Sequence, residues 1–202
     1  KTHQCKKGVV VVNIDAEIVS RKTSWSNWAG NQRAEGVSIF KPKTEVELQQ
    51  IVRHTLANGM RVKAVGSGHS FTAIALAEEV LVDLADYDDV IEIDQTKKTI
   101  TVQSGIQLSK INEVLHQNGL AMQNLGDIAY QTIAGAISTS THGTGVKFTG
   151  IANQVTALRI VLADSSVVDC SLNSNPELFH CARVGLGALG LISTVTLQLV
   201  PA

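Results

Sequence analysis

The residues whose types and spacing could support chemistry are concentrated in one glycine- and serine-rich segment, Ala64–Phe71, with the sequence AVGSGHSF. Small residues let the main chain approach a ligand closely, and successive backbone N–H groups in such a loop can bind an anion. His69 stands in the middle of the segment, and a neutral imidazole is a potential nucleophile or proton carrier. Two interpretations are open here: a ligand-binding loop with a reactive histidine, or a tight turn with a structural one.

A second candidate region is Asn124–Gly145, NLGDIAYQTIAGAISTSTHGTG. Most residues from Ala134 to Thr141 are small, and their hydroxyl groups can donate to and accept from a phosphate or a ribose. A tightly packed contact between a helix and a sheet, followed by a polar turn, explains the same composition equally well. His142 lies beside a Gly-Thr-Gly turn, where a histidine often only caps the backbone.

The sequence GLGALG, Gly185–Gly190, matches the pattern G-x-G-x-x-G letter for letter. A dinucleotide-binding fingerprint of this kind must follow a strand and open a helix, so that the helix N-terminus faces the pyrophosphate. Here a predicted helix precedes the motif and a predicted strand follows it. We therefore predict that the motif does not bind NAD, and infer only that its backbone passes close to something flat or bulky.

Helix and strand signals alternate in the first half of the chain, where the histidine loop must be positioned. Thr44 and Glu47 form a capping box that predicts the start of a helix, and Gly59 predicts its end. The predicted strands are Val37–Phe40, Arg61–Val65 and Val80–Asp83. This is a βαβ pattern whose second strand runs directly into the histidine loop.

The second half favours antiparallel strand pairs and short helices. A helix carrying Leu108, Ile111 and Leu115 is predicted to end at Gly119, and Asn175-Pro176 carries the cap and first-turn residues of another. The predicted strands are Val90–Ile93 and Thr99–Gln103 around the turn DQTKK, Val155–Leu162, Val167–Cys170, and Leu191–Val200, which ends at Pro201. We expect two α+β lobes, divided near Leu84–Asp88.

The remaining histidines and the tryptophans give weaker signals. His54, His116 and His180 lie on predicted helices without a metal-ligand spacing, so we expect surface or structural roles. Trp25 and Trp28 are predicted to pack at the edge of a lobe rather than to form a stacking platform.

Composition excludes several classes of function. The chain has 202 residues with 17 basic and 18 acidic side chains, and only Lys6-Lys7 cluster, so a nucleic-acid partner is disfavoured. Val9–Val12 is far shorter than the roughly 20 apolar residues of a transmembrane helix. Cys5, Cys170 and Cys181 have no metal spacing and indicate free thiols in a reducing compartment. We expect a soluble, cytoplasmic protein without a metal, with peripheral membrane association left open.

The motifs AVGSGHSF, NLGDIAYQTIAGAISTSTHGTG and GLGALGLIS, in this order and spacing, resemble the FAD-binding domain of vanillyl-alcohol-oxidase-type flavoproteins. WSNWAGN and FKPKTEVELQQIV resemble the branch of aldonolactone and alditol oxidases. The resemblance covers residues 23–202 and leaves 1–22 as an N-terminal extension. It implies an α+β, two-lobed FAD-binding domain of the vanillyl-alcohol oxidase / p-cresol methylhydroxylase type, with lobes at about 23–86 and 87–202. It also implies that a C-terminal substrate domain is absent from this chain.

The resemblance assigns roles to particular residues. His69 carries a covalent bond to the 8α-methyl group of FAD, and the main chain at Ile192 contacts the adenine end. The other residues implied to line the flavin and its diphosphate are Ala64, Val65, Gly66, Ser67, Gly68, Ser70, Asp127, Thr132, Gly135, Thr139, Ser140, Thr141 and His142. Asp127 departs from the family, whose members usually carry Ser or Ala there. Gly126 is expected to be an oxygen gate beside the flavin edge; the alternative is a glycine kept for a turn with positive φ.

The function implied by the resemblance is oxidation of a sugar lactone or alditol, such as a gulono-, galactono- or arabinono-1,4-lactone. A hydride passes to flavin N5, and O2 reoxidises the flavin to give H2O2. The catalytic acid and base belong to the substrate domain and are not named. Two alternatives stay open: a dehydrogenase or reductase of the same fold with another electron acceptor, and a non-catalytic remnant that binds flavin or acts as an interaction module.

Overall fold

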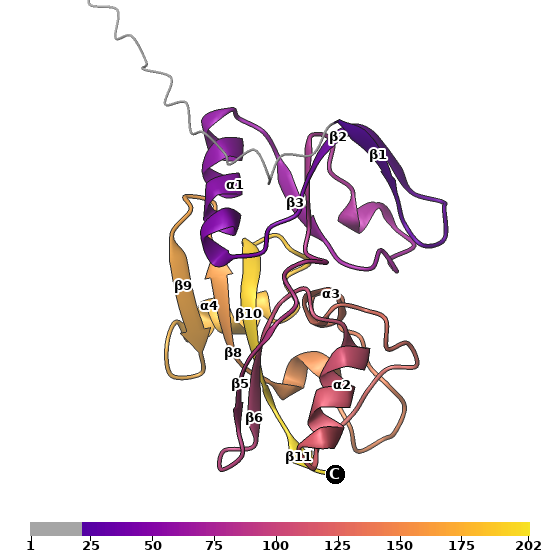
Figure 1. Ribbon diagram of the computed structural model, residues 1–202, viewed down its shortest axis with the longest axis vertical. Helices are drawn as coiled ribbons and strands as arrows, with labels where there is room; N and C mark the ends of the chain where they lie inside the picture. Colours follow the sequence, from indigo (N-terminus) through magenta and orange to yellow (C-terminus); the bar gives the residue numbers. More distant parts are fainter. Residues whose placement is uncertain (1–21) are drawn as a thin grey trace, which may run out of the picture.

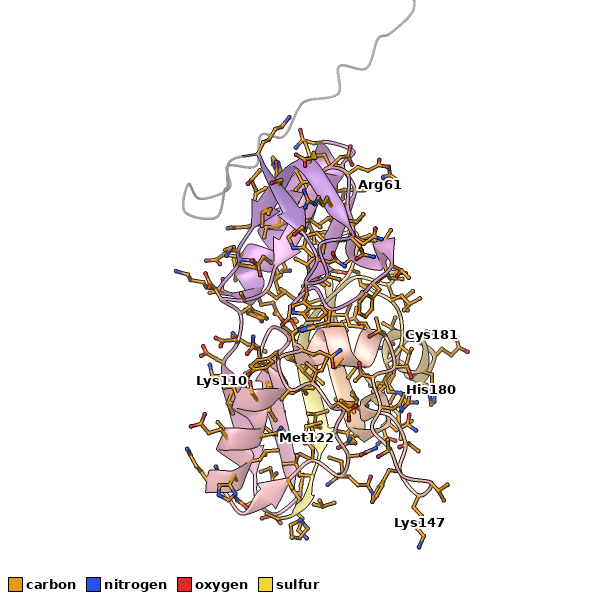
Figure 2. The ribbon with its side chains drawn as sticks, turned by 90° about the vertical axis from the view of Figure 1, so that its right-hand side faces the viewer. Arg61, Lys110, Met122, Lys147, His180 and Cys181 are labelled. Atoms are coloured by element: carbon orange, nitrogen blue, oxygen red, sulfur yellow. The ribbon has the colours of Figure 1, made fainter. Side chains whose placement is uncertain are left out.

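The computed structural model describes residues 22–202 and shows two lobes arranged along the long axis of the molecule (Figure 1). Figure 2 places Arg61 at the tip of the first lobe and Lys147 at the far end of the second. The first lobe contains a four-stranded sheet in the order β1-β2-β4-β3, in which β4 runs parallel to both β2 and β3. The elements of this lobe are β1 (Thr23–Ser26), β2 (Arg33–Phe40), α1 (Glu45–Ala57), β3 (Val62–Val65), the 3-10 turn η1 (Ala73–Ala75) and β4 (Val80–Asp83).

The second lobe is built on a five-stranded antiparallel sheet in the order β5-β6-β10-β8-β9. A short ladder between β7 and β11 extends beside it. The elements are β5 (Val90–Asp94), β6 (Thr99–Gln103), α2 (Leu108–Gln117), β7 (Leu120–Ala121), α3 (Ile133–Ser138), η2 (Ile151–Gln154), β8 (Val155–Val161), β9 (Val167–Ser171), α4 (Pro176–Ala182), β10 (Leu191–Gln198) and β11 (Val200–Pro201). The helices, the mixed first sheet, in which β1 and β2 are antiparallel, and the antiparallel second sheet confirm the predicted α+β class.

Helix α1 joins the two lobes through a shared core. The predicted capping box is present: Thr44 Oγ1 accepts from Glu47 N, and the Glu47 side chain accepts from Thr44 N. The buried face of α1 carries Leu48 and Ile51, both with no exposed surface. This face belongs to a cluster that includes strands of the first sheet and also Val161 and Leu191 of the second. Burial of apolar surface on both sides therefore holds the lobes in a defined arrangement.

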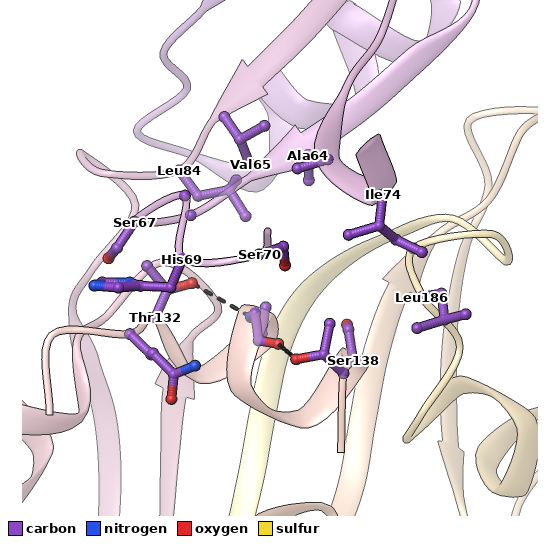
Figure 3. Close-up of a pocket in the computed structure, with 18 of the residues that line it drawn as sticks. Ala64, Val65, Ser67, His69, Ser70, Ile74, Leu84, Thr132, Ser138 and Leu186 are labelled. Atoms are coloured by element: carbon purple, nitrogen blue, oxygen red, sulfur yellow. Dashed lines mark hydrogen bonds between the residues drawn. The ribbon is translucent and has the colours of Figure 1, made fainter. Parts of the chain in front are cut away.

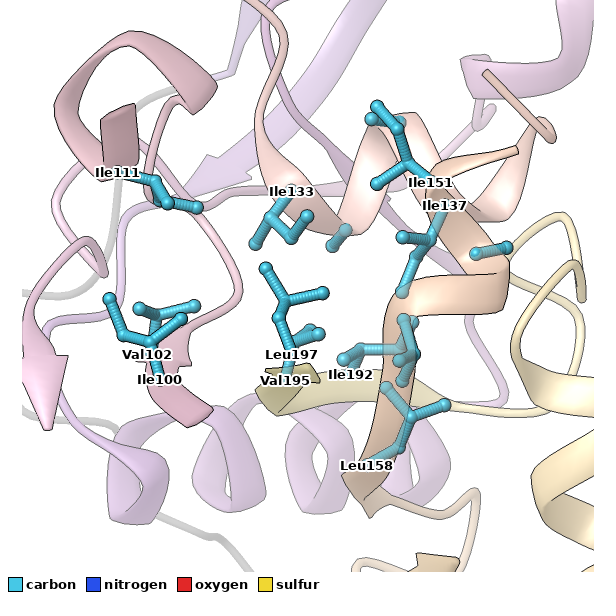
Figure 4. Packing of buried hydrophobic residues seen from close by; sticks show 14 of the residues in the cluster. Ile100, Val102, Ile111, Ile133, Ile137, Ile151, Leu158, Ile192, Val195 and Leu197 are labelled. Atoms are coloured by element: carbon cyan, nitrogen blue, oxygen red, sulfur yellow. The ribbon is translucent and has the colours of Figure 1, made fainter. Parts of the chain in front are cut away.

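The main core lies on one face of the second sheet, where α2, α3 and α4 cover it (Figure 4). Val195 and Leu197 of β10 are completely buried beneath Ile133 and Ile137 of α3. The alternation along β10 follows the period of a half-buried strand, because the intervening Thr194 and Thr196 point to the other face. Thr196 Oγ1 lies 2.9 Å from Thr101 Oγ1 on that face.

The predicted start of α4 at Asn175-Pro176 is confirmed, but the predicted side-chain cap is absent. Asn175 has a left-handed conformation with φ 50°, and its Nδ2 donates to Asp169 O at 2.9 Å. The prediction of one continuous strand over Leu191–Val200 is wrong, because the strand is interrupted at Leu199. Pro201 pairs with Leu120 as the last residue of β11, at a ladder edge where a missing N–H is tolerated.

The predictions on membrane spans and cysteines can be compared with the structure only within the described residues. No helix among residues 22–202 is long and apolar enough to cross a membrane. Cys170 and Cys181 are free thiols, and burial raises the pKa of Cys170. Cys5, Lys6-Lys7 and Val9–Val12 lie outside the described residues.

Candidate functional site

A cavity of about 510 Å³ lies between the two lobes (Figure 3). Its lining comes from three separated stretches of chain, with Leu84 at the junction of the lobes. Figure 3 shows His69 toward one end of the cavity and Leu186 toward the other. The lining residues are Ala64, Val65, Gly66, Ser67, Gly68, His69, Ser70, Phe71, Thr72, Ile74 and Ala75 from the first lobe, and Gln131, Thr132, Ala134, Gly135, Ser138, Thr139, Leu186, Gly187, Gly190 and Ile192 from the second.

The cavity is lined by backbone groups and by uncharged polar side chains. Among residues 22–202, no Lys, Arg, Asp or Glu lines it. The loop after β3 presents its main chain to the cavity, and no described residue accepts a hydrogen bond from the N–H groups of Gly66–Ser70. Neighbouring free N–H groups form a nest that suits an anion. The cavity is therefore equipped to bind a ligand that is negatively charged in part and apolar elsewhere.

The loop passes so close to α3 that a side chain would not fit. A Cβ atom at Gly66 would overlap Oγ1 of Thr132, the residue that caps α3. Thr132 Oγ1 accepts from Gly135 N at 3.3 Å, and Thr139 Oγ1 donates to Gly135 O at 3.0 Å. Gly68 has φ +69°, a conformation that favours glycine. Both glycines of the predicted phosphate loop thus have a steric reason to be glycine.

His69 is held in place while one of its nitrogens has no partner. The Nδ1 atom is buried, and no described residue makes a hydrogen bond to it. The imidazole stacks on Trp28, with ring centroids 5.9 Å apart and an interplanar angle of 28°. A buried nitrogen without a partner costs free energy in a folded protein. Such an atom is expected where a ligand completes the site.

The loop after α4 forms the other end of the cavity. Leu186, Gly187 and Gly190 have φ of 52°, 69° and 134°, and all three line the cavity together with Ile192. A Cβ atom at Gly190 would lie 2.5 Å from Val161 O, so the backbone of this loop is pressed against β8. The predicted context of the GLGALG motif is confirmed, because α4 precedes it and β10 follows it. The backbone of the GLGALG motif passes close to the cavity and to β8, which is the close approach inferred from its glycines.

The structure brings together most of the predicted site residues but not all of them. Gly126, Asp127, Ser140, Thr141 and His142 are outside the cavity lining. The His142 ring is exposed, and its Nδ1 lies 2.8 Å from Gly143 O. Gly126 does not have a positive φ, so the alternative that a left-handed turn requires this glycine is wrong. A Cβ atom there would lie 3.0 Å from Thr141 Cγ2.

The small-residue segment is divided between the core and the cavity. Ala136 and Ile137 are buried in the main core, whereas Gly135, Ser138 and Thr139 line the cavity. The packing interpretation is confirmed for the core face of α3, and ligand binding by the other face stays a prediction.

Several lining residues were not predicted. Leu186, Gly187 and Gly190 belong to the GLGALG motif. Its glycines indicated that the backbone passes close to a neighbour, and this was the signal in the sequence that could have identified these residues. The prediction for Trp28 is wrong: its side chain is 69% exposed and stacks on His69. Trp25 does pack at the lobe edge, against a small cluster that includes Leu81.

On the other side of the lobe junction, a polar network connects α1 with the second sheet. Arg159 Nε donates to Glu45 Oε2 at 2.8 Å, and Arg159 Nη1 donates to Asp169. Ser193 Oγ donates to the same Glu45 oxygen at 2.7 Å and lies 2.9 Å from the Tyr87 hydroxyl. A register shift between Ile192 and Thr194 of β10 accompanies this placement of Ser193.

This network changes the acidity of its members. The hydrogen bond from Arg159 lowers the pKa of Glu45, and the bond from Ser193 acts in the same direction against the effect of burial. Burial raises the pKa of Tyr87. The hydrogen bonds to Glu45 and Asp169 raise the pKa of Arg159. The carboxylate and the guanidinium are therefore both charged at neutral pH, and each has several partners.

Comparisons with known proteins agree with this geometry. The sequence profile of the family described as "FAD binding domain" matches residues 38–171. The chain is 42% identical over 177 residues to an L-gulono-1,4-lactone dehydrogenase of Mycobacterium tuberculosis, and the match covers 88% of this chain and 41% of the relative. It is 37% identical to an L-gulonolactone oxidase of Mus musculus, with 88% and 40% covered. An L-galactono-1,4-lactone dehydrogenase of Arabidopsis thaliana is 37% identical, with 87% and 29% covered.

Solved structures show the same fold at lower identity. A solvent-stable cholesterol oxidase superposes with a TM-score of 0.84 and 24% identity, over 94% of this chain and 39% of that one. Cholesterol oxidase from Brevibacterium sterolicum gives a TM-score of 0.80 and 18% identity, over 91% and 37%. The chain thus spans about two fifths, or less, of the length of the proteins it resembles.

Proposed function

The chain belongs to the FAD binding domain family, and from this premise we propose that it is the FAD-binding part of an enzyme that oxidises a sugar lactone or an alditol. The observation that carries the proposal is the uncharged cavity whose wall presents the free N–H groups of Gly66–Ser70. The relatives named above act on gulono- and galactono-1,4-lactone by their names, and this is the substrate class we propose.

The residues present fit FAD. A dinucleotide has a diphosphate between two flat ring systems, and the cavity offers an N–H nest in the Gly66–Ser70 loop together with apolar side chains at Ile74 and Leu186. With no cationic side chain in the lining, the diphosphate charge is met by backbone dipoles. Thr132 and Thr139 add hydroxyl groups at the start and end of α3. We propose that Ile192 contacts the adenine end through its main chain.

His69 is proposed as the covalent anchor of the flavin. Its buried Nδ1 without a partner and its ring held by Trp28 support this role. With FAD bound, an imidazole nitrogen of His69 would form the bond to the flavin 8α carbon. One imidazole N–H bond and one 8α C–H bond would break, and dioxygen would take up the two electrons and two protons as hydrogen peroxide. His69 would then hold the flavin against dissociation.

When bound, FAD accepts a hydride from a substrate carbon that carries a hydroxyl group. The described residues of this chain bind and orient the cofactor: the Gly66–Ser70 loop holds the diphosphate, and the α3 face closes the cavity below it. None of the residues 22–202 that line the cavity is charged, so this part of the chain offers no carboxylate or lysine there as a general base. We propose that a C-terminal substrate domain supplies that group.

The spectrum of the acid-precipitated full-length protein tests the cofactor and the anchor together. We expect flavin absorbance in the pellet of the wild type and only in the supernatant of His69→Ala. His116→Ala is the matched control, because His116 is exposed on α2, away from the cavity lining. Flavin in the pellet of His69→Ala would disprove the anchor. The absence of any flavin in the wild type would favour the interaction-module alternative.

We propose dioxygen as the electron acceptor, with Gly126 controlling its access. The relatives include proteins named oxidase and proteins named dehydrogenase, so the acceptor has to be measured. A Cβ atom at Gly126 would crowd Thr141 Cγ2, so an added methyl group changes the shape of this region. In Gly126→Ala we expect slower reoxidation of reduced flavin by oxygen with unchanged reduction by lactone, followed by stopped-flow spectroscopy. Unchanged reoxidation would exclude the gate.

A further inference from the structure

The turn between β1 and β2 binds the carbonyl groups of the histidine loop. Trp28 N donates to Gly68 O at 2.8 Å, and Asn27 Nδ2 donates to Ser70 O at 2.9 Å. Asn31 Nδ2 and Gln32 Nε2 both donate to Phe71 O, at 3.0 and 3.1 Å. Every one of these bonds runs from a donor in the turn to a carbonyl of the loop. The opposite groups of the loop, its N–H donors, are the ones left free.

The turn is itself fixed, so it can act as a support. Asn27 is only 4% exposed, and its Oδ1 accepts from Gln32 N at 3.0 Å while its Nδ2 also donates to Asn31 Oδ1 at 2.7 Å. The side-chain amide of Asn27 therefore has one orientation. A Cβ atom at Gly68 would lie 3.3 Å from Trp25 Cζ2 and 3.5 Å from Trp28 N, so the loop lies directly against the turn.

Trp28 adds contact with the imidazole. Although 69% exposed, its ring stacks on His69 and meets Phe71 edge to face, with centroids 6.4 Å apart. An exposed tryptophan gains little from burial, so the stacking and the backbone bond to Gly68 O are the interactions that hold it. The same interactions limit the rotation of the His69 ring.

We propose that the β1–β2 turn, residues 27–32, is a positioning element for the cofactor. Asn27 binds Ser70 O and orders the turn, so that the N–H groups of Gly66–Ser70 face the cavity, and Trp28 sets the plane of the imidazole for bonding to the flavin. This inference rests on the proposed function. The turn lies before residue 38, where the match to the FAD binding domain family begins. Trp28 and Asn27 act through the loop and are positioning residues.

The proposal separates two measurable quantities. Loss of the Asn27 amide donor should weaken non-covalent FAD binding, because the free N–H groups lose their common direction. Loss of the Trp28 ring should slow covalent attachment while leaving non-covalent affinity nearly unchanged. A role in folding alone would change both quantities together or neither of them.

The experiment uses the full-length protein prepared without flavin and then supplied with FAD. Non-covalent affinity is measured by quenching of flavin fluorescence in the first minutes, and covalent attachment by in-gel fluorescence over time. For Trp28→Ala we expect attachment about tenfold slower with a less than threefold change in affinity, and for Trp28→Phe nearly the wild-type rate, since a phenyl ring still stacks. For Asn27→Ala and Asn27→Asp we expect affinity at least about tenfold weaker. Asn27→Asp keeps the acceptor for Gln32 N if Asn27→Ala fails to fold.

Controls and outcomes distinguish this inference from the proposed function. Leu172→Ala and Asn173→Ala change exposed residues of the β9–α4 connection and should match the wild type. Wild-type attachment in Trp28→Ala, or equally slow attachment in Trp28→Phe, would overturn the role of Trp28. Wild-type affinity in both Asn27 variants would overturn the role of Asn27. Tight FAD binding without any attachment in the wild type overturns the Trp28 proposal and the His69 anchor but leaves FAD binding intact, whereas no FAD binding overturns the proposed function as a whole.

Discussion

The two sides of the lobe junction differ in how completely their polar groups are satisfied. On the α1 side, Glu45 receives hydrogen bonds from Arg159 and Ser193, and Gln49 Nε2 donates to Ser165 O at 2.8 Å. On the cavity side, the N–H groups of Gly66–Ser70 and Nδ1 of His69 have no described partner. The two lobes therefore meet at two places: on the α1 side the polar groups named are hydrogen-bonded to one another, and on the cavity side several have no described partner. We call these the finished side and the incomplete side.

This difference distinguishes polar groups that stabilise the fold from polar groups that are left for a ligand. Buried polar groups in folded proteins are normally paired, so a region where several lie unpaired in a cavity needs an explanation outside the chain. The charged network on the α1 side is the more prominent feature by residue type, yet its charged groups are paired with one another. The loop that contains no charge is the binding site we propose. Unpaired groups are here the better guide to function than charged ones.

Gly66→Ala tests the incomplete side with the largest expected effect. The added Cβ overlaps Thr132 Oγ1 at the cap of α3, so the loop must move away from its anion-binding position. We expect non-covalent FAD affinity to fall on the order of 100-fold, equivalent to about 2.8 kcal/mol. The measurement is titration of the flavin-free protein with FAD. The double variant Gly66→Ala/Thr132→Ala should recover part of the loss.

The control for this variant is Gly59→Ala. Gly59 has φ +65° after α1 and lies away from the cavity lining, so alanine there strains the backbone without touching the site. We expect lower thermal stability with unchanged FAD affinity. If Gly66→Ala bound FAD as tightly as the wild type, the loop would not be the diphosphate site.

Glu45→Gln tests the finished side. Glutamine keeps the shape but removes the charge that Arg159 and Ser193 bind, and both ends of the ion pair are partly exposed, at 39% for Arg159 and 27% for Glu45. We expect the free energy of unfolding to fall by about 1–2 kcal/mol, measured by urea denaturation near pH 7. The exposed Glu35→Gln is the control and should have little effect.

The pH dependence of this effect follows from the lowered pKa of Glu45. An acid whose pKa is lower in the folded state contributes stability above its ordinary pKa of about 4.3, and this contribution is lost as the pH falls through the folded-state pKa. The difference in unfolding free energy between wild type and Glu45→Gln should therefore be constant near neutral pH and shrink below about pH 4. A difference that stays constant on acidification would contradict the lowered pKa.

Tyr87→Phe gives the smallest expected change. It removes the hydroxyl that lies 2.9 Å from Ser193 Oγ but keeps the buried ring, and Ser193 retains its bond to Glu45. We expect a loss of about 1 kcal/mol in unfolding free energy and no change in FAD affinity. A clear loss of FAD affinity in Tyr87→Phe would show that the two sides of the junction are coupled, contrary to the separation described above.

The parts of the fold that could be predicted from the sequence depend on local signals. The capping box at Thr44 and Glu47 and the glycine after α2, Gly119 with φ +66°, each specify an end within a few residues. The hairpin of β5 and β6 was predicted from alternation and a polar turn. These signals work because the interactions that decide them lie within one or two turns of the chain.

The site was predicted less completely because much of it depends on contacts distant in sequence. The AVGSGHSF loop is local, and its residues are in the cavity as expected. The contact of Asn27 with Ser70 joins residues 43 positions apart, and no spacing in the sequence indicates it. The exclusion of Thr141 and His142 from the lining likewise depends on how the chain leaves α3. The shift in β10 that accompanies the placement of Ser193 against Glu45 has no signature in residue types.

The position of β10 in the second sheet has a consequence for the order in which the protein can fold. Leu191–Gln198 lies between β6 and β8: Thr194–Gln198 pairs with Thr99–Gln103 on one edge, and Leu191–Leu197 pairs with Val155–Val161 on the other. During synthesis, β6 and β8 leave the ribosome before β10, so their inner edges are unpaired until β10 emerges. Contacts across nearly 100 residues close slowly, and open edges of this kind promote aggregation. We expect nascent chains that stop before Leu191 to depend on chaperones until the last central strand arrives.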